Sequence, residues 1–235
     1  MPGNPLEQYF RKPAIYIELP SKGNFYGEEQ PKLSADGELA VLGMTAKDEL
    51  TLKNPDALLN GEGIITVLQS VVPDIPDPRK IPISDFNCIL IGMRIASYGK
   101  EMDYSIACVE CNNIDNVSFD LYEILATVTS LANEYIVELE NGVKIYVQPT
   151  TVATHNKIAL STMEQGKLLD LLDAGNLSEG EKVTQFNKVF TTLTTITLDL
   201  VQDGIVKVIL PDEKVVENTR HIREWISNIT KKEYD

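Results

Sequence analysis

The sequence contains few of the residues that usually build reactive sites. Among its 235 residues there are three cysteines, two histidines and one tryptophan. Three cysteines are too few for a disulfide framework, so we expect reduced thiols. No apolar run approaches the roughly 18 residues of a membrane span, and the N-terminus lacks the apolar core of a signal peptide. These absences predict a chain that is made and kept in the cytoplasm and has no membrane partner.

Basic residues are also scarce. The chain has 21 Lys and Arg against 35 Asp and Glu, which gives a net charge of -14. Nucleic-acid-binding proteins usually cluster Lys and Arg on one face, so this balance argues against a nucleic-acid partner. The 43% hydrophobic content suits a soluble protein with one large domain or two small ones. A basic protein partner and a homo-oligomer both stay open.

The common catalytic motifs are missing. The sequence has no Gly-rich phosphate loop, no Gly-x-Ser-x-Gly elbow and no His-Glu-x-x-His helix. His155 and His221 fall in predicted amphipathic helices, where we expect them at the surface. Arg94 lies within an apolar segment and is expected at the rim of the core. We therefore predict no enzyme, no catalytic residue and no cofactor, although a site assembled from scattered polar residues stays open.

Alternating apolar residues predict several strands. The segments AIYIELP and GELAVLGM predict a two-stranded β arm near the N-terminus. MDYSIACVEC and IDNVSFDL predict two strands joined by a tight turn. EYIVELENGVKIYVQP predicts a hairpin, because Asn141-Gly142 favours the positive φ angles of a type I′ turn. A further strand, IVKVIL, is expected near the C-terminus.

Helical periodicity and capping residues predict the remaining elements. Thr45 with Asp48, and Ser178 with Glu181, have the spacing of capping boxes. The apolar segment 84–99 is expected to start with Ser84 as its N-cap and to stop at Gly99. We also expect a helix, broken near Gly166, before the second capping box, an apolar stripe along the helix that follows it, and a last helix at the C-terminus.

Together these elements predict an α+β fold. Its order is an N-terminal β arm, a central helical segment with a Cys-x-x-Cys strand turn, a β-hairpin and C-terminal helices. We expect a flexible arm over residues 1–12, a region of β arm, helices and Cys-x-x-Cys strands over 13–130, and a hairpin with mainly helical structure over 131–235. The last two regions can also form one integrated domain.

Cys108 and Cys111 form the one motif with metal-binding or redox spacing. A closed zinc site needs four ligands, and no cysteine follows Cys111. Cys88 could supply a third thiolate if its helix points back at the turn, and otherwise it is a small core residue. A redox pair normally sits at a helix N-terminus, whereas strands flank this one. We therefore expect a structural turn with reduced thiols, and a metal-binding or redox module on Cys108 and Cys111 is the alternative.

Several short segments occur in one order along the chain. LPSKGNFYG comes first, followed by MTAKDEL and NPDALLNG, then RIASYG, and then the Cys-x-x-Cys turn before a strand ending in FDL. This order resembles the T4-type bacteriophage base plate protein family, whose members include hub subunits and hub-assembly proteins of contractile-tailed phages. The resemblance spans Leu19 to Leu121, and the C-terminal half adds little recognisable detail to it.

The resemblance implies a non-enzymatic structural or assembly protein of the baseplate hub, which organises the end of the tail. Such a protein acts through contacts with other hub or tail proteins. It implies host cytoplasm as the location during assembly, and the tail baseplate as the location in the virion. In relatives the Cys-x-x-Cys turn resembles a zinc-ribbon knuckle. Because the second knuckle is absent here, the resemblance implies no metal. Whether the protein remains in the virion or acts transiently as a chaperone stays open.

Overall fold

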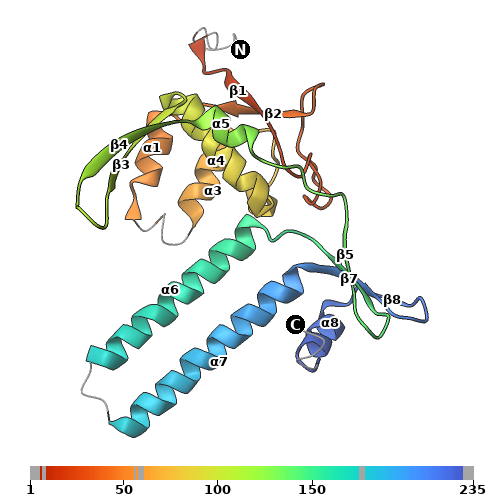
Figure 1. Ribbon diagram of the computed structural model, residues 1–235. Helices are drawn as coiled ribbons and strands as arrows, with labels where there is room; N and C mark the ends of the chain where they lie inside the picture. Colours follow the sequence, from red (N-terminus) through yellow and green to blue (C-terminus); the bar gives the residue numbers. More distant parts are fainter. Residues whose placement is uncertain (1–5, 7–8, 56, 58–60, 175–177, 230–235) are drawn as a thin grey trace. The chain divides into compact units, whose positions relative to one another are not determined.

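The computed structural model describes residues 6, 9–55, 57, 61–174 and 178–229. The chain divides into two compact units, Met1–Leu131 and Ala132–Asp235 (Figure 1). Both contain helices and antiparallel strands, so the predicted α+β class is confirmed. The arm expected over 1–12 lies partly outside the described residues, and the predicted division into regions stays a prediction. Within the described part, no helix has both the length and the apolar content needed to cross a bilayer.

The first unit is built around the predicted β arm. Strands β1 (Pro13–Glu18) and β2 (Glu38–Leu42) pair antiparallel. Their inward side chains follow the two-residue period of a strand, and Ile17 and Val41 are almost fully buried. Helix α4 (Ile83–Tyr98) packs against both strands. Gly92 allows this close approach, because a Cβ atom there would lie 3.3 Å from two side-chain atoms of Ile17.

The helices of this unit lie around the same core. They are α1 (Ala46–Leu52), α3 (Glu62–Val71), α4 (Ile83–Tyr98) and α5 (Leu121–Ala126). The proline-rich connector between α3 and α4 contains a single 3-10 turn, η2 (Pro78–Lys80). The largest part of the buried core comes from α3 and its neighbours. This part includes Ile65, Val67, Leu68, Val71, Val72, Ile75, Ile81 and Ile89.

The ends of α4 show one wrong and one confirmed prediction. Ser84 is not the N-cap, because the helix begins at Ile83 and Pro82 occupies the cap position. The carbonyl of Pro82 already accepts the N–H of Phe86 at 2.9 Å, which places the first turn ahead of Ser84. Gly99 does end the helix, with φ +87. A left-handed backbone of this kind favours glycine.

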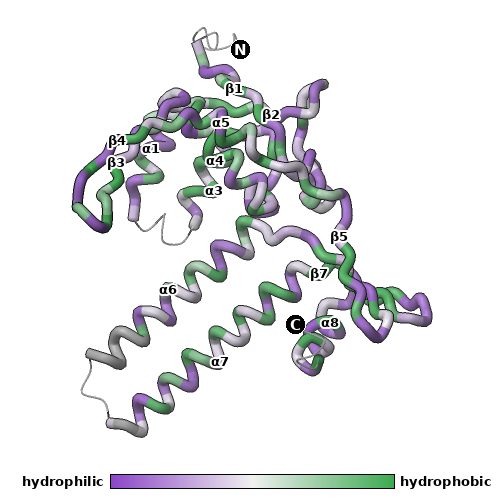
Figure 2. The backbone as a smooth tube through the Cα atoms, in the orientation of Figure 1, coloured by the Kyte–Doolittle hydropathy of each residue, from purple (hydrophilic) through white to green (hydrophobic). Residues whose placement is uncertain are grey.

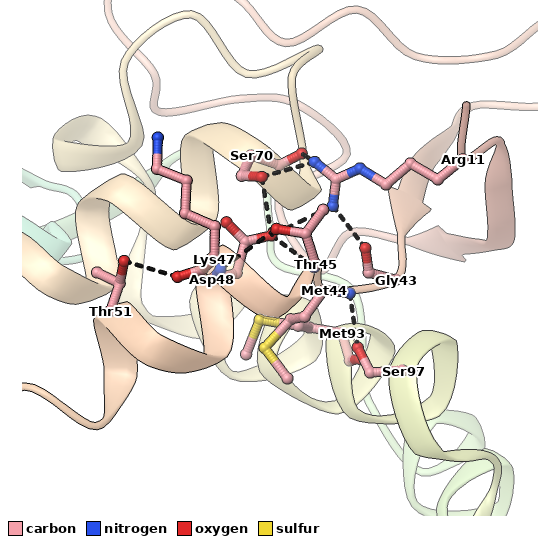
Figure 3. A network of polar contacts seen from close by, with 10 residues as sticks. All are labelled: Arg11, Gly43, Met44, Thr45, Lys47, Asp48, Thr51, Ser70, Met93 and Ser97. Atoms are coloured by element: carbon pink, nitrogen blue, oxygen red, sulfur yellow. Dashed lines mark hydrogen bonds and ion pairs between the residues drawn. The ribbon is translucent and has the colours of Figure 1, made fainter. Parts of the chain in front are cut away.

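A polar cluster around Asp48 ties the start of the chain to three elements of this unit (Figure 3). Thr45 and Asp48 form the predicted capping box of α1, with the Thr45 N–H and hydroxyl each donating to Asp48 at 2.8 Å. Ser70 of α3 donates to the same carboxylate at 3.0 Å. The Arg11 guanidinium lies 3.4 Å from Asp48 and donates to the carbonyls of Gly43 and Ser70. One carboxylate thus links the N-terminal segment, the end of β2, α1 and α3.

The pKa of Asp48 reflects these contacts. Burial of the carboxylate favours its neutral form and opposes ionisation. The hydrogen bonds from Thr45 and Ser70, with the nearby Arg11 charge, favour the ionised form more strongly. The net result holds the pKa of Asp48 below its usual value.

A second buried carboxylate, Asp85, fixes the loop between β1 and β2. It lies in the first turn of α4 and accepts the Ser21 N–H at 2.9 Å, the Ser21 hydroxyl, and the Tyr26 hydroxyl at 2.9 Å. Burial raises the pKa of Asp85, and the three donated bonds partly offset that rise. All the groups in this cluster are buried and bonded to one another, so it is a structural clamp.

The second unit has a four-stranded antiparallel sheet. Its order is β5 (Tyr135–Glu138), β6 (Lys144–Val147), β7 (Ile205–Ile209) and β8 (Val215–Val216). The predicted hairpin β5–β6 is present, but its turn is not the predicted type I′, because Gly142 has a positive φ of +81 and Asn141 does not; the Gly142 N–H donates to the Leu139 carbonyl at 2.9 Å. Helix α8 (Thr219–Ile226) packs on this sheet. The small core between them contains Val143, Val208, Ile222 and Ile226.

A long helical hairpin completes the second unit (Figure 1). Helix α6 (Val152–Ala174) and helix α7 (Glu179–Asp203) pack along each other. The Ser178–Glu181 capping box at the start of α7 is confirmed. The break expected at Gly166 is absent, because α6 runs through this residue. An isolated glycine costs a helix only about 1 kcal/mol relative to alanine, which the packing of α6 against α7 can offset.

The Asp48 cluster gives a pH-dependent prediction. We expect Asp48→Asn to lower the free energy of unfolding by about 1–3 kcal/mol at pH 7, because a charged acceptor with several donors is lost. The folded-state pKa is depressed, so this contribution is present above the ordinary Asp value of 3.8 and disappears as pH falls through the folded pKa.

The measurement is urea unfolding of both proteins between pH 3 and pH 7. Asp36→Asn is the matched control, since Asp36 is exposed and should change stability by less than about 0.5 kcal/mol. An Asp48→Asn deficit that stays constant or grows toward pH 3 would contradict the assignment.

Candidate interaction surfaces

The Cys-x-x-Cys segment forms a two-stranded β ribbon. Strands β3 (Glu101–Ala107) and β4 (Ile114–Asp120) pair antiparallel, with Met102 opposite Phe119 and Tyr104 opposite Val117. Directly opposed residues in such a pair lie on the same face, and successive residues alternate between faces. The register therefore separates the side chains of the ribbon by chemistry.

One face of the ribbon is apolar and exposed. Its members, here called the apolar ribbon face, retain between 36% and 57% of their accessible surface and are Met102, Tyr104, Ile106, Val117 and Phe119. The opposite face is largely polar. There the Ser105 hydroxyl donates to the Asn116 side chain at 2.6 Å, and Asp103 lies opposite Ser118. Figure 2 shows both hydrophobic and hydrophilic residues along the two strands.

The ribbon has little support from the rest of its unit. Among the described elements, β3 and β4 contact each other extensively, and α5, which follows β4 in the chain, is the other element that packs against β4. A two-stranded ribbon without further packing is marginally stable in water. Contiguous exposed apolar side chains commonly mark a protein contact. The apolar ribbon face therefore has the properties of a surface that another molecule covers.

Cys108 and Cys111 lie in the turn at the end of this ribbon. The Cys108 N–H donates to the Asn113 carbonyl and the Asn112 N–H donates to the Cys108 carbonyl, both at 2.8 Å. Asn112 adopts φ +56, the left-handed conformation that asparagine tolerates well. The backbone N–H groups of Cys111 and Glu110, and the Cys111 thiol, donate to the Cys108 sulfur and lower the pKa of that thiol. Both cysteines are free.

The third cysteine does not complete a metal site. Cys88 is buried in α4, where burial raises the pKa of its thiol to about 11. No group of three or more His, Cys, Asp or Glu side chains placed to hold a metal exists within the described residues. His155 and His221 lie in α6 and α8 of the other unit, as expected from their periodicity. The absence of a metal at Cys108 and Cys111 stays a prediction.

The second unit carries its own exposed apolar row. Val183, Phe186 and Phe190 of α7, here called the α7 stripe, are 57–64% exposed. Their spacing of three and four residues places them on one side of the helix. Val189, three residues after Phe186, is buried at the edge of this row. The sequence predicted one continuous apolar stripe along α7, but its N-terminal part remains outside the core.

Several threonines of α7 bond to their own helix. Six hydroxyls donate to the carbonyl four residues earlier, from Thr184, Thr191, Thr192, Thr194, Thr195 and Thr197. Each bond is between 2.8 and 3.0 Å long. The hydroxyl donors of these threonines are therefore already satisfied within the helix.

The remaining polar sites are explained by local structure. Arg94, expected at the rim of the core, donates to the carbonyls of Gly99 and Glu101 and lies 4.9 Å from the Tyr98 ring centre. It joins the end of α4 to the start of β3. Sequence reasoning did not identify the Asp85 clamp or the apolar ribbon face. The alternation of Met102, Tyr104 and Ile106 with polar residues was the signal for the second of these.

The comparison with protein families identifies the family of this chain. Residues 37–235 match the family described as T4 bacteriophage base plate protein. This match covers most of the sequence, so the chain belongs to that family and has a structural role in the phage baseplate. The match includes the C-terminal half, which has few of the recognisable segments of the family. Searches of curated proteins and of solved structures each found no match.

The thiol environments give a second prediction. At pH 7.5 we expect iodoacetamide to modify Cys108 at least about tenfold faster than Cys88, because thiolate is the reactive form and Cys88 is both buried and raised in pKa. Peptide mass spectrometry of the native protein measures each rate, and labelling in urea should remove the difference.

Elemental analysis of the same full-length protein tests the metal alternative. We expect less than stoichiometric zinc, and we expect the Cys108→Ser, Cys111→Ser double variant to keep its thermal unfolding midpoint. One bound zinc per chain that this variant loses would establish the alternative instead.

Proposed function

We propose that the chain is a non-enzymatic component or assembly factor of the baseplate hub and that it works by binding other hub or tail proteins. The observation that carries the proposal is an exposed apolar row in each of the two units: the apolar ribbon face and the α7 stripe. Apolar rows of this size usually mark protein contacts. Two such rows on separate units would allow one chain to contact two neighbours.

The polar clusters support a structural role. Asp48 caps α1 and holds Arg11, and Asp85 clamps the loop after β1. Their hydrogen-bonding groups are occupied by neighbouring parts of the chain, so they serve the fold.

The α7 stripe provides the test of this function. Tagged full-length protein, expressed in cells infected with the phage that encodes it, should recover baseplate hub or tail proteins identified by mass spectrometry. Replacing both Phe186 and Phe190 with Ser should reduce that recovery by at least about tenfold, because buried aromatic anchors dominate most interfaces.

The control changes exposed polar positions on the same helix, Gln185→Ser with Asn187→Ser, and should leave the recovery within about twofold. Both variants alter exposed side chains and should unfold at nearly the wild-type temperature. If the wild-type protein recovers no baseplate or tail protein, the proposed function is wrong.

Purified virions distinguish the two forms of this role. A resident hub component should be present in mature particles at a fixed ratio to other baseplate proteins, as measured by quantitative mass spectrometry. An assembly factor should be found with baseplate intermediates and be missing from mature particles. Absence from both fractions would contradict each form.

A further inference from the structure

The charge of the ribbon is one-sided. Residues 101–120 contain five carboxylates, from Glu101, Asp103, Glu110, Asp115 and Asp120, and no Lys or Arg. Asp120 forms an ion pair with Lys100 at the base of the ribbon, at 2.6 Å. Within the described part of the chain, no ion pair involves Asp103, Glu110 or Asp115. The ribbon therefore combines an exposed apolar centre with unneutralised negative charge.

Asp115 lies on the apolar ribbon face at its turn end, where the Asn113 side chain donates a hydrogen bond to it at 3.3 Å. It lies directly opposite Ile106, so its side chain shares the face that carries Tyr104 and Val117. A surface that covers this face will remove water from Asp115 as well. A carboxylate that loses water is destabilised unless the covering molecule supplies donors, and a Lys or Arg side chain supplies both the donors and the opposite charge.

We propose that the apolar ribbon face docks onto a different protein whose surface has an apolar centre bordered by Lys or Arg, with one basic side chain meeting Asp115. This inference rests on the proposed function and specifies the partner's chemistry. In a symmetric contact, a second copy of the chain would bring its own ribbon, with Asp115 and the neighbouring carboxylates, against like charges, which costs several kcal/mol in typical interfaces. Nucleic acid would repel the same carboxylates.

Neighbouring residues on one strand provide a matched pair of probes. Tyr104 lies on the apolar face and Ser105 on the polar face, where it bonds to Asn116. The photoreactive residue p-benzoyl-phenylalanine is introduced at one position or the other in the full-length protein, in infected cells. After irradiation, the linked peptides are identified by mass spectrometry.

The Tyr104 probe should link to a peptide of another baseplate or tail protein that combines apolar residues with Lys or Arg. Its yield should exceed that of the Ser105 probe by at least about tenfold. Equal yields from the two positions, no product from Tyr104, or products with peptides of this chain or with a partner site lacking Lys and Arg would each overturn the proposal.

Charge variants test the basic contact directly, each combined with the Tyr104 probe. Asp115→Lys should lower the cross-link yield by at least about tenfold, and the isosteric Asp115→Asn by several-fold, as expected for a desolvated charge pair. Asp103→Lys makes the same charge change on the opposite face and should alter the yield by less than about threefold. Equal effects of Asp115→Lys and Asp103→Lys would show a general charge effect and overturn the Asp115 contact.

These results separate the inference from the proposed function. Affinity recovery of baseplate proteins by the wild-type chain tests the function and does not depend on the ribbon probes. Successful recovery with a silent Tyr104 probe would overturn the ribbon contact and leave the function standing. Thermal unfolding of each variant checks that it is folded. Asp115→Asn keeps the side-chain shape, so it tests the charge of Asp115 even if Asp115→Lys fails to fold.

Discussion

The first unit depends on the carboxylate of Asp48. It accepts hydrogen bonds from Thr45 at the start of α1 and from Ser70 of α3, and it pairs with Arg11, which also donates to the Gly43 carbonyl at the end of β2. A buried carboxylate is costly, and here the cost is offset by donated hydrogen bonds and by the Arg11 guanidinium. The cluster fixes the start of the unit, while Asp85 fixes the loop between the first two strands. Helix α4, which carries Asp85, packs on the β1–β2 pair, and the ribbon begins shortly after α4.

Neither unit buries all of its apolar side chains. Each buries enough apolar surface to form a core, and each leaves other apolar side chains exposed, among them the apolar ribbon face and the α7 stripe. In the first unit the row is on a two-stranded ribbon that few elements support. In the second it lies on α7, toward the helix start and away from the small sheet core. The chain belongs to the baseplate family, and the proposed function assigns both rows to contacts with other proteins.

The sequence predicted elements whose signals are local. Both capping boxes, the position of the hairpin turn at Asn141-Gly142 and the end of α4 at Gly99 each depend on residues a few positions apart. The Asp85 clamp was not predictable in this way, because its partners lie 59 and 64 residues away in the sequence.

The exposed rows show a different limit of sequence reasoning. Alternation in β3 and helical spacing in α7 identify an apolar face, but an identical pattern serves a buried core or a partner contact. Val189 is buried and Phe190 is exposed on the same helix, and only the packing of α6 against α7 decides between them. The prediction of Ser84 as the N-cap of α4 was wrong because the carbonyl of Pro82 already accepts the first hydrogen bond of the helix.

The threonines of α7 have a consequence for how that helix can be covered. A hydroxyl that depends on water for its hydrogen bond resists burial, because covering it leaves an unsatisfied donor. Here the donors are already used by carbonyls of the previous turn, so the surface they line behaves more like one of methyl groups. Such a helix can remain hydrated before assembly and lose its water afterwards at little cost. Its composition therefore allows the same surface to exist stably in both the free and the assembled state.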